Sequence, residues 1–145
     1  MKLLTVGFIF DQSLESVLLV HKQKPDWQIG KLNGVGGKVE DNETGLTCIA
    51  RECFEETTLN LPTSVWHQYA TAVHETNTEE KKQIDFFTAI YSGQKSDAKK
   101  GDYEEVEWFA SDHLPDNILP NLSFLIPMAR YKLQGHNVGE VVIRY

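Results

Sequence analysis

Apolar residues gather in two short runs near the start of the chain. Both runs, 3–10 (LLTVGFIF) and 16–21 (SVLLVH), are rich in β-branched and aromatic residues. The polar stretch DQSLE between them is short enough for a turn, so the two runs are typical of consecutive strands. A polar loop follows and leads into a glycine cluster, GVGGK, at 34–38.

The spacing of the apolar residues changes at 44–59 (TGLTCIARECFEETTL), where it predicts a helix. One stripe of this helix is made of apolar or small residues: Leu46, Ile49, Ala50, Cys53 and Thr57. Thr44 stands just before the stripe and suits the N-cap, because its hydroxyl can accept a bond from a free N–H of the first turn. The carboxylates of the segment fall to one side of this stripe.

The second half of the chain continues with strand-like and helical segments. The expected strands are 64–76, 82–92, 104–110 and an edge strand at 140–145 (EVVIRY). The first two are joined by an acidic and basic tip, NTEEKK, at 77–82. A final helix is expected at 119–133, with Pro127 interrupting it. This irregular alternation predicts a single domain, 1–145, of the α/β (α+β) class with a mixed sheet.

The net charge of the chain argues against some classes of binding partner. The chain has 145 residues, 41% of them hydrophobic, and a formal net charge of −7. An acidic surface argues against binding a nucleic-acid polymer or an anionic membrane, because no basic field would attract either. A small anionic substrate stays compatible with this charge, because bound cations can reverse the local sign. No stretch approaches the roughly 20 apolar residues of a membrane span.

The two cysteines predict a reducing, cytoplasmic location. Cys48 and Cys53 are five residues apart on one predicted helix, where they point in different directions. A disulfide between them would break the helix, so we expect free thiols. The start, MKLLTVGFIFDQ, lacks a small-residue cleavage site and is interpreted as a strand and not a signal peptide.

Three glutamates crowd one face of the predicted helix. Glu52, Glu55 and Glu56 stand at positions i, i+3 and i+4, within an arc of about 100°. Each like-charged pair at this spacing costs roughly 0.2–0.5 kcal/mol in an isolated helix. Only Arg51 offsets the repulsion on this face. The face is therefore either solvated or the binding site of a cation.

Residues 37–59 (GKVEDNETGLTCIARECFEETTL) resemble the Nudix box at a fixed spacing. The positions in register are Gly37, Glu43, Arg51, Glu52, Cys53, Glu55, Glu56 and Leu59. Thr58 departs from the box, which has a glycine there, and a β-branched residue is costly if that position needs a positive φ. The resemblance implies a Nudix fold, a mixed β-sheet sandwiched between helices.

The resemblance also implies a metal-dependent hydrolase with Mg²⁺ or Mn²⁺. It makes Glu52, Glu55 and Glu56 the metal ligands, helped by the carbonyl of Gly37, with Glu43 and Arg51 as supporting residues. A further acidic ligand would come from Glu104 or Glu105, and neither is preferred. Such ions bind phosphate oxygens and activate water for displacement at phosphorus. Which glutamate acts as general base is left open.

The segment GKLNGVGGKVEDNET is most similar to the MutT-like branch, which removes pyrophosphate from oxidised purine nucleoside triphosphates. By this resemblance Asn33 and Asn121 read the base, since an amide both donates and accepts hydrogen bonds. Asn33 is otherwise part of a turn, and Asn121 a helix cap. Trp27 either stacks on the base or covers the core. Two surface lysines are candidates for phosphate contacts: Lys22 and Lys38.

The leading hypothesis is therefore hydrolysis of a nucleoside diphosphate linkage, from a (d)NTP to the monophosphate and pyrophosphate. The protein would act on this small nucleotide substrate as a monomer or homodimer. Alternative enzymes with the same fold cleave ADP-ribose or nucleotide sugars. A non-catalytic nucleotide-binding module and an acidic protein-interaction domain are the alternatives from other classes.

Overall fold

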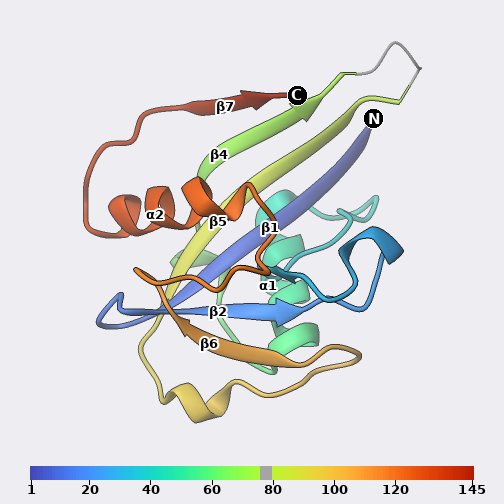
Figure 1. Cartoon of the computed structure of the whole chain (residues 1–145). Helices are drawn as coiled ribbons and strands as arrows, with labels where there is room; N and C mark the ends of the chain where they lie inside the picture. Colours follow the sequence, from blue (N-terminus) through green and yellow to red (C-terminus); the bar gives the residue numbers. More distant parts are fainter. Residues whose placement is uncertain (76–79) are drawn as a thin grey trace.

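The computed structural model describes residues 1–75 and 80–145. Its strands are β1 (Lys2–Asp11), β2 (Ser16–His21), β3 (Leu32–Asn33), β4 (His67–His74), β5 (Lys82–Tyr91), β6 (Val106–Ala110) and β7 (Val141–Arg144). The helices are α1 (Gly45–Thr57) and α2 (Leu122–Leu133), with 3₁₀ turns η1 (Asp26–Gln28), η2 (Thr63–Val65) and η3 (Lys95–Asp97). Figure 1 shows their arrangement.

The described strands form one mixed sheet in the order β3-β2-β1-β5-β4-β7, with β6 on the far side of β2. β1 and β5 lie parallel at its centre and pair over their full lengths, from Lys2 with Lys82 to Asp11 with Tyr91. β2 is antiparallel to β1, and β4 is antiparallel to β5. β7 adds to β4 in parallel at one edge, as expected of a closing edge strand (Figure 1).

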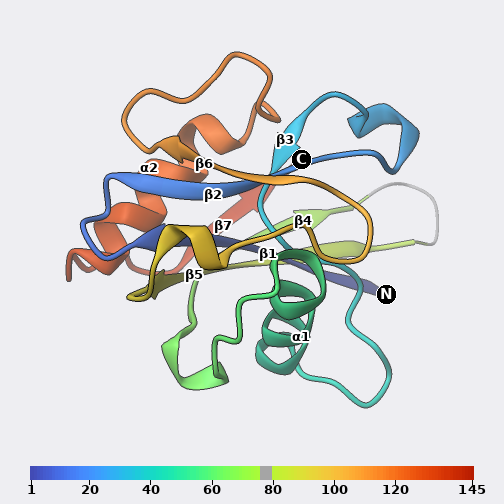
Figure 2. The same ribbon diagram turned by 90° about the horizontal axis from the view of Figure 1, so that it is seen from below.

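The two helices cover opposite faces of this sheet (Figure 2). Ile49 and Cys53 of α1 pack with Trp66 and Phe87 on one face. On the other face, buried residues of α2 pack with Phe8, Phe86 and their neighbours: Leu122, Leu125, Ile126 and Ala129. Successive side chains of a strand point to opposite faces of the sheet, so the continuous apolar runs of β1 and β5 contribute to both cores. The predicted α/β class, with a mixed sheet between helices, is confirmed.

Helix α1 buries a slightly different stripe from the one predicted. Ile49, Cys53 and Thr57 are buried as expected, and Cys48 is buried in addition. Leu46 is instead 40% exposed. The two cysteines are both free, so the predicted absence of a disulfide between them is confirmed.

Several predicted boundaries are wrong by two or three residues. The strand expected from residue 64 begins at His67, because the 3₁₀ turn η2 occupies the preceding residues. The strand expected from 104 begins at Val106. The tip at 77–82, and the end of the first of these strands at residue 76, lie partly outside the described residues.

Pro127 does not interrupt the last helix, contrary to the prediction. Helix α2 starts at Leu122, three residues later than expected, and runs through Pro127 to Leu133. Pro127 is exposed and Leu125, Ile126 and Ala129 are buried, so packing on the sheet holds the helix together across the proline. Among the described residues no helix has the length and apolar character needed to cross a membrane.

Candidate active site

The glycine cluster runs alongside the first half of β1 and reaches the carboxylates of α1. Gly7 and Val35 exchange backbone hydrogen bonds of 2.7 and 3.0 Å, and the Thr5 N–H donates to the Gly37 carbonyl at 2.9 Å. The approach is too close for side chains: a Cβ on Gly36 would lie 1.9 Å from the Thr5 carbonyl oxygen. A Cβ on Gly37 would lie 2.4 Å from Glu52 Oε1. Glycine is therefore required at 36, where the obstacle is the backbone of β1, whereas a side chain at 37 would displace the carboxylate of Glu52.

Helix α1 starts at the predicted cap. The Thr44 hydroxyl accepts from the Thr47 N–H at 3.2 Å, and the Thr47 hydroxyl accepts from the Thr44 N–H at 2.9 Å. This reciprocal capping box satisfies two free N–H groups and fixes where the helix begins. It thereby fixes the direction in which the later glutamates point.

Arg51 is the centre of an ionic network on α1. Its Nε and Nη2 donate to the two carboxylate oxygens of Glu43 at 2.7 and 2.8 Å. Its Nη1 donates to Glu52 and to Glu55, both at 3.1 Å. The bidentate pair of Arg51 with Glu43 is the strongest geometry available to an arginine and a carboxylate, and it lowers the pKa of Glu43. The predicted role of Glu43 and Arg51 as supporting residues agrees with this geometry.

Glu56 lies deepest of the three helical carboxylates. Its Oε2 accepts from the Gly36 N–H at 2.8 Å. Burial raises the pKa of Glu56 to about 8, and the charges of Glu52 and Glu104 act in the same direction. Burial also raises the pKa of Glu52, against the opposing charge of Arg51. A nearby cation would lower the pKa of both carboxylates and so favour their charged forms.

The structure separates Glu104 from Glu105. Glu104 is only 6% exposed, and its carboxylate accepts from Lys22 Nζ at 3.2 Å and from the Gln23 N–H. The charges of Glu104 and Lys22 both act on the pKa of Glu56, which places this pair beside the helical carboxylates. Glu105 points outward, with 69% of its side chain exposed and Lys100 at 3.7 Å. Lys22 is thus an ion-pair partner of a site carboxylate and is itself largely buried.

The residues predicted to bind the base lie around β3. Asn33 Oδ1 accepts from the Gly34 N–H at 2.8 Å, as in the turn interpretation. Asn121 occupies the N-cap position of α2 but makes no side-chain capping bond. The loop before α2 joins β3 through a bond from the Leu119 N–H to the Leu32 carbonyl at 3.0 Å. Trp27 is 66% exposed on η1, so it does not cover the core.

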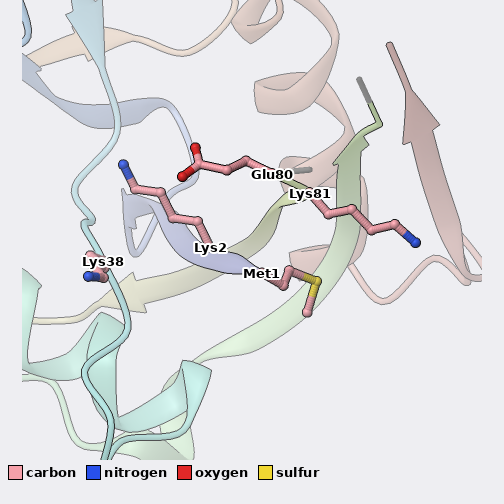
Figure 3. A pocket seen from close by; sticks show the side chains of 5 residues that line it. All are labelled: Met1, Lys2, Lys38, Glu80 and Lys81. Atoms are coloured by element: carbon pink, nitrogen blue, oxygen red, sulfur yellow. The ribbon is translucent and has the colours of Figure 1, made fainter. Parts of the chain in front are cut away.

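The carbonyl of Lys38 accepts from Arg51 Nη2 at 3.4 Å, and Lys38 also lines a surface cavity of about 280 Å³ near the start of β1. The cavity is lined by Met1, Lys2, Lys38, Glu80 and Lys81. Figure 3 shows that the side chain of Lys81 points away from those of Lys2 and Lys38, and that Glu80 extends among them. The ammonium groups therefore do not converge on one point, and the cavity has no defined anion site.

The donor set suits a hard divalent cation, although each carboxylate is engaged by the protein. Carboxylate oxygens are the ligands that Mg²⁺ and Mn²⁺ prefer. Within 1–75 and 80–145 no three His, Cys, Asp or Glu side chains converge as a metal centre. Glu52 and Glu55 contact Arg51, Glu56 contacts Gly36, and Glu104 contacts Lys22. Ion binding would exchange some of these contacts. The Gly37 carbonyl, already bonded to Thr5, stays a predicted ligand.

Sequence reasoning missed a segment that closes the far end of α1. Backbone N–H groups of Lys99, Gly101 and Asp102 donate to the last carbonyls of the helix, at 2.9, 3.0 and 2.9 Å. Thr58 adopts the left-handed conformation at the helix end, with φ 65°, and its hydroxyl donates to the Asp97 carbonyl at 3.2 Å. The only signal in the sequence is the glycine in KKGD, which is common in any loop.

Comparisons with known proteins agree with this geometry. The family model described as NUDIX domain matches residues 1–128. The NUDIX domain of Shewanella oneidensis NrtR, complexed with ADP ribose, is 20% identical with a TM-score of 0.71; the match covers 90% of this chain and 87% of that one. A MutT NUDIX hydrolase from Burkholderia pseudomallei is 20% identical with a TM-score of 0.70, covering 88% and 96%.

A C. elegans Ap4A hydrolase in a binary complex is similar at 15% identity and a TM-score of 0.69, covering 94% of this chain and 100% of that one. At such low sequence identities, the structural similarity is evidence for a shared fold alone. No match was found among curated proteins. The family model spans most of the chain and includes the whole acidic helix with its glycine loop. The chain therefore belongs to the NUDIX domain family.

Proposed function

We propose that this protein is a hydrolase of nucleoside diphosphate linkages that converts a purine (d)NTP, including oxidised forms, to the monophosphate and pyrophosphate. The observation that carries the proposal is the acidic face of α1: Glu52 and Glu56 lie against the glycine loop, and the charges of Glu104 and its partner Lys22 act on Glu56. A cluster of carboxylates in an acidic protein has no affinity for phosphate by itself. Divalent cations supply the missing positive charge.

Mg²⁺ or Mn²⁺ would be held by Glu52, Glu55, Glu56 and Glu104, and would polarise the diphosphate and lower the pKa of the attacking water. Glu105 is left out, because its side chain is turned to solvent. Arg51 orients Glu52 and Glu55 through its bonds to both. Glu43 holds Arg51 from the other side, so the network restricts the carboxylates to one face of the helix.

Base recognition is assigned to the edge of the sheet near β3. The Oδ1 of Asn33 is occupied by the Gly34 N–H, which leaves its Nδ2 group to donate to an acceptor on the base. The side chain of Asn121 makes no capping bond and is exposed. Trp27 offers an exposed ring for stacking. Lys22 contributes positive charge beside the carboxylates, whereas Lys38 would contact only a phosphate extending toward β1.

The test is release of pyrophosphate or phosphate from a panel of oxidised and normal purine triphosphates, ADP-ribose, UDP-glucose and a dinucleoside tetraphosphate, with Mg²⁺ or with EDTA. Preference for an oxidised purine triphosphate that falls in Asn33→Ala supports the assignment. Turnover of ADP-ribose or UDP-glucose would keep the acidic helix as the active site and reject base reading by the asparagines. Nucleotide binding without product would identify a non-catalytic module.

A further inference from the structure

The C-terminal end of α1 is held by a segment that is distant in sequence. The last carbonyls of a helix have no intrahelical partner. Here the Glu55 carbonyl accepts from Asp102, the Glu56 carbonyl from Gly101 and the Thr57 carbonyl from Lys99. Two of these three acceptors, Glu55 and Glu56, belong to residues that carry site carboxylates. We call residues 97–104 the grip segment; it passes beside one end of α1 in Figure 2.

Gly101 is the point of closest approach between the grip segment and the helix. A Cβ on this residue would lie 1.8 Å from the Glu55 carbonyl oxygen and 2.7 Å from the carbonyl carbon of Glu56. Both obstacles are backbone atoms, so no side-chain rotation can relieve the overlap. Any other residue at 101 would push the grip segment away from α1.

The other end of the grip segment carries Glu104 into the site. Glu104 follows Gly101 by three residues and is fixed there by Lys22 and the Gln23 N–H. The next residue is anchored as well, because its carbonyl accepts from the His21 N–H at 2.8 Å. A short chain therefore connects the carbonyls of Glu55 and Glu56 to the carboxylate of Glu104, whose charge acts on Glu56.

Thr58 forms an additional contact between the end of α1 and the grip segment. A threonine in the left-handed conformation is strained, and the box position it occupies is otherwise a glycine. Its hydroxyl donates to the Asp97 carbonyl at the start of the grip segment. The residue that departs from the box is thus bonded to the segment that closes the helix.

We infer that the grip segment positions Glu104 against the carboxylates of α1, with Gly101 as the positioning residue that sets this spacing. The inference rests on the proposed function, in which Glu104 binds the divalent ion. Gly101 touches neither ion nor substrate, and acts only through the backbone of α1 and the placement of Glu104.

The experiment is a double-mutant cycle of Gly101→Ala and Glu104→Gln, with Mn²⁺ affinity of the full chain measured by electron paramagnetic resonance and thermal stability measured in parallel. Gly139→Ala is the control for a loss of stability alone, since its φ of 68° strains an alanine there although no atom lies within 4 Å of the added Cβ. We expect Gly101→Ala to weaken Mn²⁺ binding about tenfold. In the Glu104→Gln background the same change should weaken it less than twofold, because the group it positions is gone.

Equal losses in both backgrounds, or no loss in either, would overturn the positioning role. If Gly101→Ala does not fold, Thr58→Val takes its place in the cycle, because it removes the bond to Asp97 while keeping the side-chain shape. It should weaken Mn²⁺ binding about twofold to threefold, and only when Glu104 is present. If the wild-type protein hydrolyses nucleotides but the effects of the two substitutions on Mn²⁺ binding are additive, this inference alone is rejected. Wild-type protein that neither binds Mn²⁺ nor hydrolyses rejects the proposed function as well.

Discussion

Arg51 shows how one side chain can make a cluster of like charges compatible with a folded helix. It bonds Glu43, Glu52 and Glu55 at once, and the contact to Glu43 is bidentate. A lysine in its place has a compact ammonium group that cannot bridge three carboxylates in this geometry. The planar guanidinium group, with its several donors, is therefore more important for this network than the positive charge alone.

We predict that Arg51→Lys lowers the free energy of unfolding by about 1–3 kcal/mol, because partly buried carboxylates lose hydrogen bonds that a single ammonium group cannot replace. Nucleotide hydrolysis should fall with it. The matched control is Arg144→Lys, whose pair with Glu75 is exposed and 3.8 Å long, and should change stability by less than about 0.5 kcal/mol. Urea titration of both variants measures the difference, and equal losses would contradict the role of Arg51.

Glu56 gives the metal-free protein a characteristic pH dependence. Its pKa is raised to about 8 by burial, whereas an unfolded chain has a glutamate pKa near 4.5. Between these values the folded state holds a proton that the unfolded state has released. The contribution of Glu56 to the stability of the metal-free protein therefore falls as pH rises from about 4.5 to 8, with the sign opposite to that of a salt-bridged carboxylate such as Glu43.

In EDTA, Glu56→Gln should remove this dependence. We expect the variant to exceed wild type by roughly 2–4 kcal/mol at pH 8.5 and to approach it at pH 5. Thermal melts across this range measure the effect, with Glu105→Gln as a control on an exposed carboxylate. A difference that is constant with pH would show that Glu56 is ionised in the folded protein.

Glu104 and Glu105 form a natural pair for testing the site. We expect Glu104→Gln to reduce metal-dependent hydrolysis by about tenfold to a hundredfold, as for residues that hold or orient a catalytic ion. Glu105→Gln should change it by less than about twofold. Steady-state kinetics at several Mg²⁺ concentrations measure both. Equal losses would mean that the two side chains exchange places when the ion binds.

At this scale the sequence indicates which candidate residues share the helix, and it says little about which distant residues lie near them. The spacing of Glu43, Arg51 and the three helical glutamates defines a network that is local to the helix and the loop before it. The choice between Glu104 and Glu105 depends on Lys22, which is 82 residues away from Glu104. No local pattern contains that information, because it arises from the pairing of loops across the sheet.

Among the elements, the end of α1 is the place where the chain departs from an ideal helix stop. Thr58 adopts φ 65° and ψ 1° where a glycine would be unstrained. The sequence predicted a cost if this position needed a positive φ, and the structure shows that it does. The strain is partly offset by the bond from its hydroxyl to the Asp97 carbonyl.

We predict that Thr58→Gly raises the free energy of unfolding by about 0.5–1 kcal/mol, since relief of left-handed strain exceeds one exposed hydrogen bond. Thr58→Ala keeps most of the strain and loses the bond, so it should be less stable than wild type. Chemical denaturation of the three proteins orders them. Alanine and glycine variants of equal stability would show that the backbone at 58 is not strained.

The boundaries of the elements show that the spacing of apolar residues predicts only some of the secondary structure. The N-cap at Thr44 is encoded by the two threonines that bond each other, so it can be recognised locally. The two-residue strand β3 and the turn η2 have no period to recognise. Pro127 predicts an interruption that does not occur, because tertiary packing of α2 outweighs the local preference.

For the whole molecule, the alternation of strands and helices predicts the class but not the order of strands. The central pairing joins β1 to β5, and the strands β2, β3 and β4 and the helix α1 lie between them in the chain. β7 returns to the edge beside β4 in parallel. Such long-range pairing depends on how both faces are covered, which hydrophobic periodicity along one segment does not specify.

The central β1–β5 pair also sets the time at which the protein can fold while it is being made. Every residue of β1 pairs with the residue 80 positions later, from Lys2 with Lys82 to Asp11 with Tyr91. At a synthesis rate of about 5–20 residues per second, β1 waits roughly 4–16 s for its partner. Nascent chains stalled before β5 has left the ribosome should be protease-sensitive, and those exposing α2 resistant. During that interval the apolar run of β1 is a binding site for chaperones.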